Sequence, residues 1–132
     1  MVIAIAAALA AAVHVYIFVI ESLRFVTAST MKTFGIASRE EAEIMRPWAF
    51  NQGFYNLFLA LIVVTGVLLY AFGSPASQLD LVGRTLIFAG VSVMLGAAVV
   101  LIASDPTKAR AAAVQALFPA VTMGALAVSA LV

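Results

Sequence analysis

The stretch AFNQGFYNLFLALIVV, residues 49–64, decides how this sequence is interpreted. Its second half is an unbroken apolar run of the kind that crosses a membrane, whereas its opening turns hold two asparagines, a glutamine and a tyrosine. A polar group in hydrocarbon costs free energy unless another group satisfies its hydrogen bonds. These amides therefore need partners within the protein or in a ligand.

The composition of the whole chain is that of a membrane protein. Of its 132 residues, 65% are hydrophobic and 10% are charged, whereas a soluble domain is roughly 45–50% apolar. About 20 apolar residues cross roughly 30 Å of hydrocarbon, and four segments are long enough: 2–23, 48–72, 81–103 and 109–131. We therefore expect an all-α, polytopic membrane protein, an antiparallel bundle of four transmembrane helices that forms a single domain over residues 1–132.

Charge and cysteine content exclude several classes of function. The formal net charge is +1 and the chain has no cysteine. This charge balance gives no reason to expect a nucleic acid as partner, and the absence of thiols excludes disulfides, thiolate metal sites and thiol catalysis. One histidine with one nearby glutamate falls short of the three or four protein ligands that zinc takes, so we expect no metal site.

Lysine and arginine predict the orientation. Six of the seven lie beside the link between the first two spans or the link between the last two: Arg24, Lys32, Arg39, Arg46, Lys108 and Arg110. Only Arg84 lies beside the other link. The positive-inside rule then places these two links in the cytoplasm and both termini outside, in the cytoplasmic (inner) membrane. The opening segment lacks a basic n-region, and we expect a retained span rather than a signal peptide.

Helix-boundary signals describe the first link. The spacing of a serine and a glutamate in segment 38–41 is that of a capping box, which predicts a short helix from Arg39. Pro47 predicts a break or the first turn of the second span. Gly35 suits the left-handed cap of a helical run over residues 22–34, so the first helix is expected to extend past the membrane surface.

The last two spans carry few polar side chains. Asp105 fits the N-cap of the fourth span, with Pro106 at its first helical position. In the third span Gly90, Ser92 and Gly96 offer small surfaces for close helix packing. We expect this helix to pack either inside the bundle or in a homo-oligomer.

Polar residues of the other three spans fall at one depth. His14 and Glu21 are seven residues apart and face the same way on an ideal helix, with Glu21 near the cytoplasmic boundary. The second and fourth spans add polar residues at a similar depth: Asn51, Gln52, Tyr55, Asn56 and Gln115. Three helices are thus expected to converge on one polar locus.

These residues carry a resemblance to a known family. The strings HVYIFVIES (14–22), NQGFYNLFLA (51–60), LGAA (95–98) and VQALFPA (114–120) are similar to motifs of small bacterial four-helix integral membrane proteins catalogued as a domain of unknown function. The similarity spans nearly the whole chain. It implies a four-helix membrane fold and a shared polar constellation, and it implies no established activity.

The polar locus has two interpretations. Facing amides can serve as interhelical hydrogen bonds, and a histidine with a glutamate can form a structural pair. A histidine, a glutamate, a tyrosine and four amides at one end of a small bundle exceed what helix register requires, and convergent polar groups in an apolar site are typical of ligand binding. We therefore expect a cytoplasm-facing pocket, surrounded by membrane lipids, for a small amphipathic or lipid-like ligand.

In that pocket His14 and Glu21 are the candidate catalytic or proton-exchanging residues. The candidate ligand-binding residues orient the ligand by hydrogen bonds: Tyr16, Asn51, Gln52, Tyr55, Asn56 and Gln115. The sequence identifies no cofactor and leaves open whether a reaction is catalysed. Two alternatives stay open: a small proton-coupled transporter that uses Glu21, and a structural subunit of a larger membrane complex.

Overall fold

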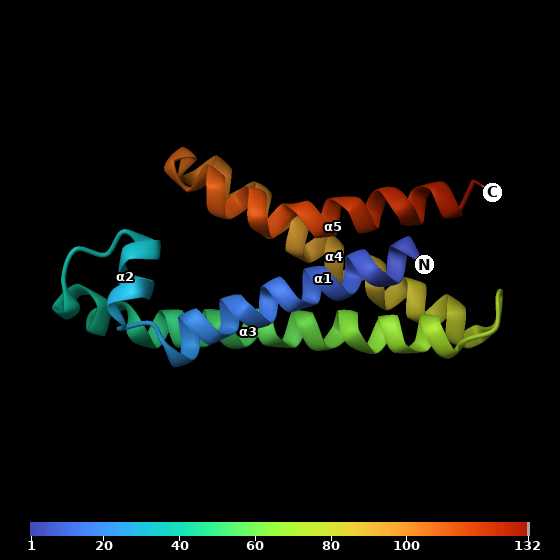
Figure 1. Cartoon of the computed structure of the whole chain (residues 1–132), viewed down its shortest axis with the longest axis horizontal. Coiled ribbons are helices and arrows are strands. Elements are labelled where there is room, and N and C mark those ends of the chain that lie inside the picture. Colours follow the sequence, from blue (N-terminus) through green and yellow to red (C-terminus); the bar gives the residue numbers. More distant parts are fainter. Residues whose placement is uncertain (132) are drawn as a thin grey trace. The chain divides into compact units, whose positions relative to one another are not determined.

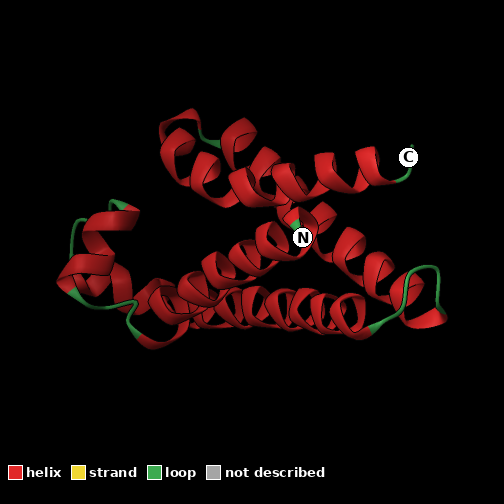
Figure 2. Ribbon diagram, turned by 45° about the vertical axis from the view of Figure 1, so that its right-hand side comes forward, coloured by secondary structure: helices red, strands yellow, loops and turns green. Residues whose placement is uncertain are grey.

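The computed structural model describes residues 1–131, and this part of the chain contains helices and loops only (Figure 2). Its long helices are α1 (Val2–Phe18), α3 (Arg39–Phe72), α4 (Gln78–Ser104) and α5 (Ala109–Ser129). The shorter elements are the π-helix η1 (Val19–Leu23), α2 (Ala28–Phe34) and the 3-10 helix η2 (Pro106–Lys108). The predicted all-α fold is confirmed.

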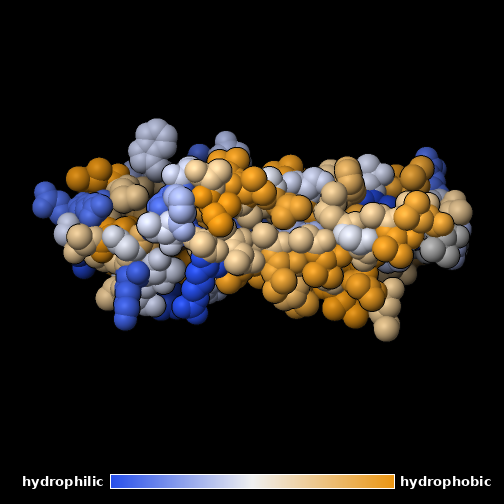
Figure 3. All heavy atoms as spheres, turned by 90° about the horizontal axis from the view of Figure 1, so that it is seen from above, coloured by the Kyte–Doolittle hydropathy of each residue, from blue (hydrophilic) through white to orange (hydrophobic). Residues whose placement is uncertain are grey.

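Four segments are long and apolar enough to cross a membrane, as the sequence predicts. They are Val2–Leu23, Arg39–Phe72, Gln78–Ser104 and Pro106–Ser129. In Figure 3 orange apolar side chains cover much of the visible surface over the long helices, and blue polar ones gather toward the end where Figure 1 draws α2. Several of the large apolar side chains are exposed, as lipid contact requires: Leu61, Phe88, Val93, Val100 and Leu117.

Contacts within the chain define two compact units. The bundle unit consists of Met1–Val13 together with the chain from Leu59 onward, and the connector unit is His14–Phe58.

Four helices share one apolar core in the bundle unit. Its buried residues come from three of them: Ile3, Ala7, Ala10 and Ala11 of α1, Ala60 and Val63 of α3, and Ile87, Val91 and Met94 of α4. Side chains of α5 pack against this core, among them Phe118, Met123 and Leu126. The contribution of α1 is mostly alanine, and small side chains let helix backbones approach closely.

The backbones of α3 and α4 approach each other closely at Gly66 and Gly83. A Cβ atom on Gly83 would lie 2.5 Å from a backbone nitrogen of α3 and 2.9 Å from the carbonyl oxygen of Gly66. At Gly90 a Cβ atom would overlap a valine methyl group of α3, so the predicted close packing of α4 is confirmed there, inside the bundle. The space beside Gly96 is open instead.

The first residue and the end of α5 lie at the same end of the bundle unit as the α3–α4 link (Figure 1). Met1 and Asp80 line one hollow, and Arg84 Nη1 donates a hydrogen bond to Ser129 Oγ at 3.0 Å. Since Arg84 lies in the second turn of α4 and Ser129 ends α5, these two packed helices run antiparallel. The placement of this end outside the membrane stays a prediction from the positive charges.

In the connector unit the helical path is interrupted between η1 and α2. Thr27 is the N-cap of α2. Its Oγ1 accepts a hydrogen bond from the N–H of Thr30 at 3.4 Å and donates one to the carbonyl of Arg24 at 2.9 Å. Gly35 ends α2 with φ 72°, so the predicted left-handed cap is confirmed. The predicted helical run over 22–34 is wrong, because the cap at Thr27 starts a new helix and the first span ends in η1.

α3 begins at Arg39, as predicted, and Ser38 Oγ accepts the N–H of Glu41 at 3.1 Å. The predicted short helix with a break or a new start at Pro47 is wrong, since α3 continues unbroken for 34 residues. A proline inside a helix leaves the carbonyl four residues earlier without its donor. Pro47 is exposed, so water can solvate the carbonyl of Glu43 that loses this hydrogen bond. A small apolar cluster is formed by Phe25, Ile36 and Ala42, and Met31 and Phe34 of α2 pack against it, which joins α2 to this part of α3.

Candidate functional site

The connector unit joins Glu21 to Asn56. Asn56 Nδ2 donates to Glu21 Oε2 at 3.1 Å and to the backbone carbonyl of Gln52 at 3.1 Å. Asn56 is 5% exposed, and Glu21 is half-buried. One amide therefore links the backbone of α3 to a carboxylate on the first candidate span.

Glu21 lies in the π-helix η1. The N–H of Arg24 donates to the carbonyl of Val19 at 3.0 Å, which is the five-residue step of a π-helix. Such segments often occur at functional sites. The prediction that His14 and Glu21 lie on the same helix face assumes 3.6 residues per turn. This assumption applies only as far as Phe18, where α1 ends and the π-helix η1 begins.

A close backbone approach holds η1 against α3. Ser22 Oγ donates to the carbonyl of Phe50 at 2.9 Å. A Cβ atom on Gly53 would overlap Ser22 Oγ and lie 3.1 Å from the Cβ of Glu21. Gly53 therefore allows the carboxylate-bearing helix to approach the helix that carries its amide partner.

Aromatic side chains lie near Glu21 and Asn56 along the sequence. The Phe18 and Phe54 ring centroids lie 5.1 Å apart in an edge-to-face arrangement. Phe54 also lies 4.9 Å from Phe50 and 6.1 Å from Phe58 between ring centroids. A ring three residues before Glu21 therefore packs on a ring two residues before Asn56.

The other predicted site residues differ in exposure. His14 is fully buried on α1. Four members are exposed: Tyr16 and Tyr55, both 58%, and Asn51 and Gln52. Because Asn56 is buried while its neighbours on α3 are exposed, these polar side chains occupy more than one face of the helix.

Gln115 lies on α5 in the bundle unit, where it is half-buried one turn before the buried Pro119. Its membership of the site stays a prediction. Within residues 1–131, no three side chains of His, Cys, Asp or Glu gather where they could hold a metal ion.

Sequence reasoning missed a second polar cluster, centred on Arg84 in the bundle unit. Its Nε donates to both carboxylate oxygens of Asp80 at 3.1 Å, and its Nη1 donates to Ser129. Its guanidinium carbon lies 5.0 Å from the ring centroid of Tyr70. The four-residue spacing of Asp80 and Arg84 was a usable local signal. Nothing in the sequence pattern pointed to Tyr70 and Ser129, which are far from Arg84 along the chain.

Comparison with known proteins places the chain in context. The family model described as "Protein of unknown function (DUF1304)" matches residues 8–127. The matched range includes all the predicted site residues as well as Arg84. No curated protein and no solved structure matches the chain significantly.

Proposed function

Because the chain belongs to the DUF1304 family of proteins of unknown function, we propose its function from the site itself: it is a membrane protein that binds a small amphipathic or lipid-like ligand at Glu21 and Asn56. One observation carries this proposal. It is the carboxylate of Glu21, set in a π-helical turn of a candidate span and held by the amide of Asn56 at 3.1 Å.

An ionisable side chain in a span is costly, and such residues mark functional sites by default. A carboxylate has about four lone-pair positions on its two oxygens. Among the described residues, Asn56 supplies the one side-chain hydrogen bond to Glu21. The other lone pairs are available to a ligand that carries a hydroxyl or an amine.

The flanks of this pair fit a molecule with polar and apolar parts. Phe18 precedes Glu21 by three residues and Phe54 precedes Asn56 by two, and their rings pack edge to face. Tyr16 and Tyr55 are exposed, so in a membrane their hydroxyl groups are accessible to a molecule dissolved in lipid. Asn51 and Gln52 of α3 complete the proposed set of orienting side chains in the connector unit.

The same atoms could serve chemistry or transport. A reaction on the ligand would use Glu21 as the proton-exchanging group, with His14 as a second such group. A proton-coupled carrier would use Glu21 alone, since a carrier needs a carboxylate that substrate or proton can occupy. These two roles differ from simple binding in that ligand turnover or proton release accompanies them.

Native mass spectrometry of protein extracted gently from its own membrane tests the proposal. We expect a bound small molecule on the wild type that is lost from Glu21→Gln and from Asn56→Leu. Glu40→Gln is the matched control, because it removes the same charge from an exposed position of the same unit. A folded wild type without a bound molecule, or one whose bound molecule survives both site variants, contradicts the proposal. Proton release on adding the identified ligand, lost in Glu21→Gln, would identify a carrier.

A further inference from the structure

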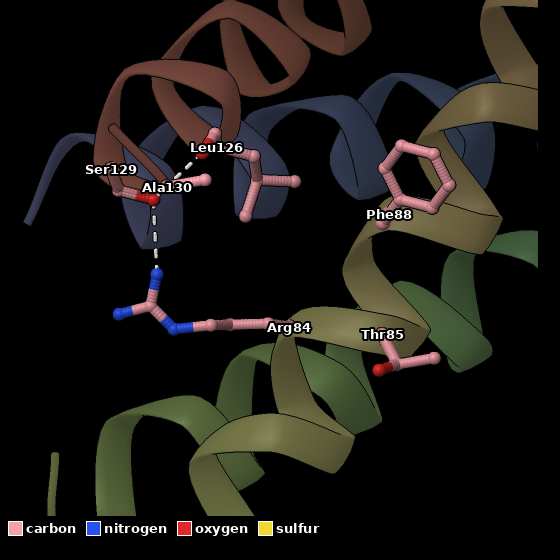
Figure 4. Close-up of a pocket in the computed structure, with 6 residues that line it drawn as sticks. All are labelled: Arg84, Thr85, Phe88, Leu126, Ser129 and Ala130. Atoms are coloured by element: carbon pink, nitrogen blue, oxygen red, sulfur yellow. Dashed lines mark hydrogen bonds between the residues drawn. The ribbon is translucent and has the colours of Figure 1, made fainter. Parts of the chain in front are cut away.

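Arg84 lies between two hollows of the bundle unit. The first, of about 260 Å³, lies between α4 and α5 (Figure 4) and is lined by Arg84, Thr85, Phe88, Leu126, Ser129 and Ala130. The second, of about 330 Å³, has Arg84, Asp80 and Tyr70 in its wall. Arg84 is the one residue that both linings share.

The guanidinium of Arg84 keeps donors free for a ligand. Asp80 takes only the Nε–H, although a carboxylate often binds two nitrogens of an arginine. Ser129 takes one hydrogen of Nη1, and its own hydroxyl donates to the carbonyl of Leu126 at 2.8 Å. Among residues 1–131, Nη2 has no hydrogen-bond partner, and the side chain is 35% exposed. Of the five N–H groups, three are therefore unused.

Ser129 fixes the direction of these donors. It accepts from Nη1 while bonded to its own helix, and so holds the guanidinium toward α5 (Figure 4). The lining then becomes apolar: Phe88, one turn beyond Arg84 on α4, is 52% exposed, and Leu126 faces it from α5. A cationic fork at the end of an apolar groove, close to the end of a candidate span, is complementary to a phosphate that carries an acyl chain.

We propose that this groove binds a phospholipid whose headgroup carries both a phosphate and an amine. The phosphate accepts from the unused N–H groups of Arg84, and an acyl chain lies along Phe88 and Leu126. Asp80 already balances the charge of Arg84, so a headgroup with no net charge keeps the site neutral, whereas a purely anionic one does not. The carboxylate of Asp80 and the ring of Tyr70, in the second hollow, are suitable partners for the ammonium. This site is independent of Glu21 and Asn56.

The test compares two phospholipids with identical acyl chains, phosphatidylethanolamine and phosphatidylglycerol, added in equal amounts to delipidated protein. Lipid retained on the protein is measured by native mass spectrometry. We expect at least fivefold more retained phosphatidylethanolamine than phosphatidylglycerol. We also expect at least a fivefold loss of phosphatidylethanolamine in Arg84→Gln. Arg110→Gln, which removes the same charge from an exposed position of α5, is the control and should retain the lipid.

A second variant protects the test against misfolding, because Arg84→Gln leaves the buried Asp80 without its cation. Ala130→Trp fills the first hollow from an exposed position and leaves the Asp80–Arg84 pair in place. We expect it to lose phosphatidylethanolamine as Arg84→Gln does. Equal retention of the two lipids, or full retention by Ala130→Trp, would overturn the proposal. Displacement of the lipid by an equal concentration of free phosphoethanolamine would overturn the part assigned to the acyl groove.

Discussion

Asn56 donates its Nδ2–H to Glu21 Oε2 at 3.1 Å, and the same nitrogen donates to the carbonyl of Gln52. The second bond keeps the amide of Asn56 over its own helix while the first reaches the carboxylate of η1. The amide is therefore oriented for Glu21 before any ligand arrives. Such preorientation serves a binding site as well as a helix contact, and the two roles can be separated by mutation.

A double-mutant cycle measures the bond itself. Asn56→Leu removes the donor and leaves the half-buried carboxylate, so we expect it to lower the free energy of unfolding by about 1–3 kcal/mol. Glu21→Leu combined with Asn56→Leu removes both polar groups and should be more stable than Asn56→Leu alone. Equilibrium unfolding in mixed detergent micelles gives these values. A coupling energy below about 0.3 kcal/mol would show that the bond contributes nothing to stability.

Two glycines in the spans should respond oppositely to alanine. Gly53→Ala places a methyl group on Ser22 Oγ, so either the Ser22–Phe50 hydrogen bond breaks or η1 and α3 separate, at a cost of about 1–3 kcal/mol. Gly96→Ala meets open space and is expected to be neutral or to stabilise by up to about 1 kcal/mol through helix propensity. Thermal unfolding in one detergent compares the two. A similar melting temperature for both variants would contradict the close approach at Gly53.

Replacing Pro47 should strengthen α3. Alanine restores an N–H that can donate to the carbonyl of Glu43, and alanine is about 3 kcal/mol more favourable than proline in a helix interior. We expect Pro47→Ala to slow amide hydrogen exchange over residues 43–51 and to raise the melting temperature. Faster amide exchange over these residues in Pro47→Ala would contradict the prediction and would show that the proline ring contributes to packing.

The link before α5 should be sensitive to acid. Hydrogen bonds from Thr107 Oγ1, at 2.6 Å, and from its N–H, at 2.9 Å, hold the pKa of Asp105 below its usual value. Because the folded pKa is below the unfolded one, this stabilisation is fully present above the unfolded pKa. It is lost as the pH falls through the folded pKa.

Thr107→Val removes the hydroxyl, so the pKa of Asp105 should rise toward its ordinary value. As the pH falls, the stabilisation from Asp105 should then begin to be lost at a higher pH. Carboxyl carbon chemical shifts of Asp105, followed by NMR during a pH titration in micelles, report this change. Thr85→Val, on a different helix, should leave the titration unchanged.

Sequence was sufficient for features that depend on a few neighbouring residues. The four spans follow from local hydropathy, and the caps at Gly35, Ser38 and Asp105 follow from the residue types themselves. The match to the DUF1304 family over residues 8–127 confirms that the chain belongs to a family of unknown function, as predicted. Glu21 and Asn56 were both expected at one depth, and the structure joins them directly.

Features that depend on distant partners could not be predicted. Which glycines meet a neighbouring backbone depends on how each helix is rotated. The sequence therefore indicated Gly96, which meets open space, and not Gly66 or Gly83, which meet backbone atoms. The π-helical turn at Glu21 adds a residue that no periodicity argument includes. The continuation through Pro47 depends on its exposure, and the contact of Arg84 with Ser129 joins residues of two helices.

The unbroken course of α3 gives this small protein a mechanical property. At 1.5 Å per residue, 34 residues make a rod of about 51 Å, some 20 Å longer than the hydrocarbon thickness of a bilayer. Asn56 lies on the same unbroken helix as Arg39. A rotation of this helix about its axis therefore moves the amide and changes its distance to Glu21. The Glu21–Asn56 hydrogen bond is thus sensitive to a torque applied at the start of α3.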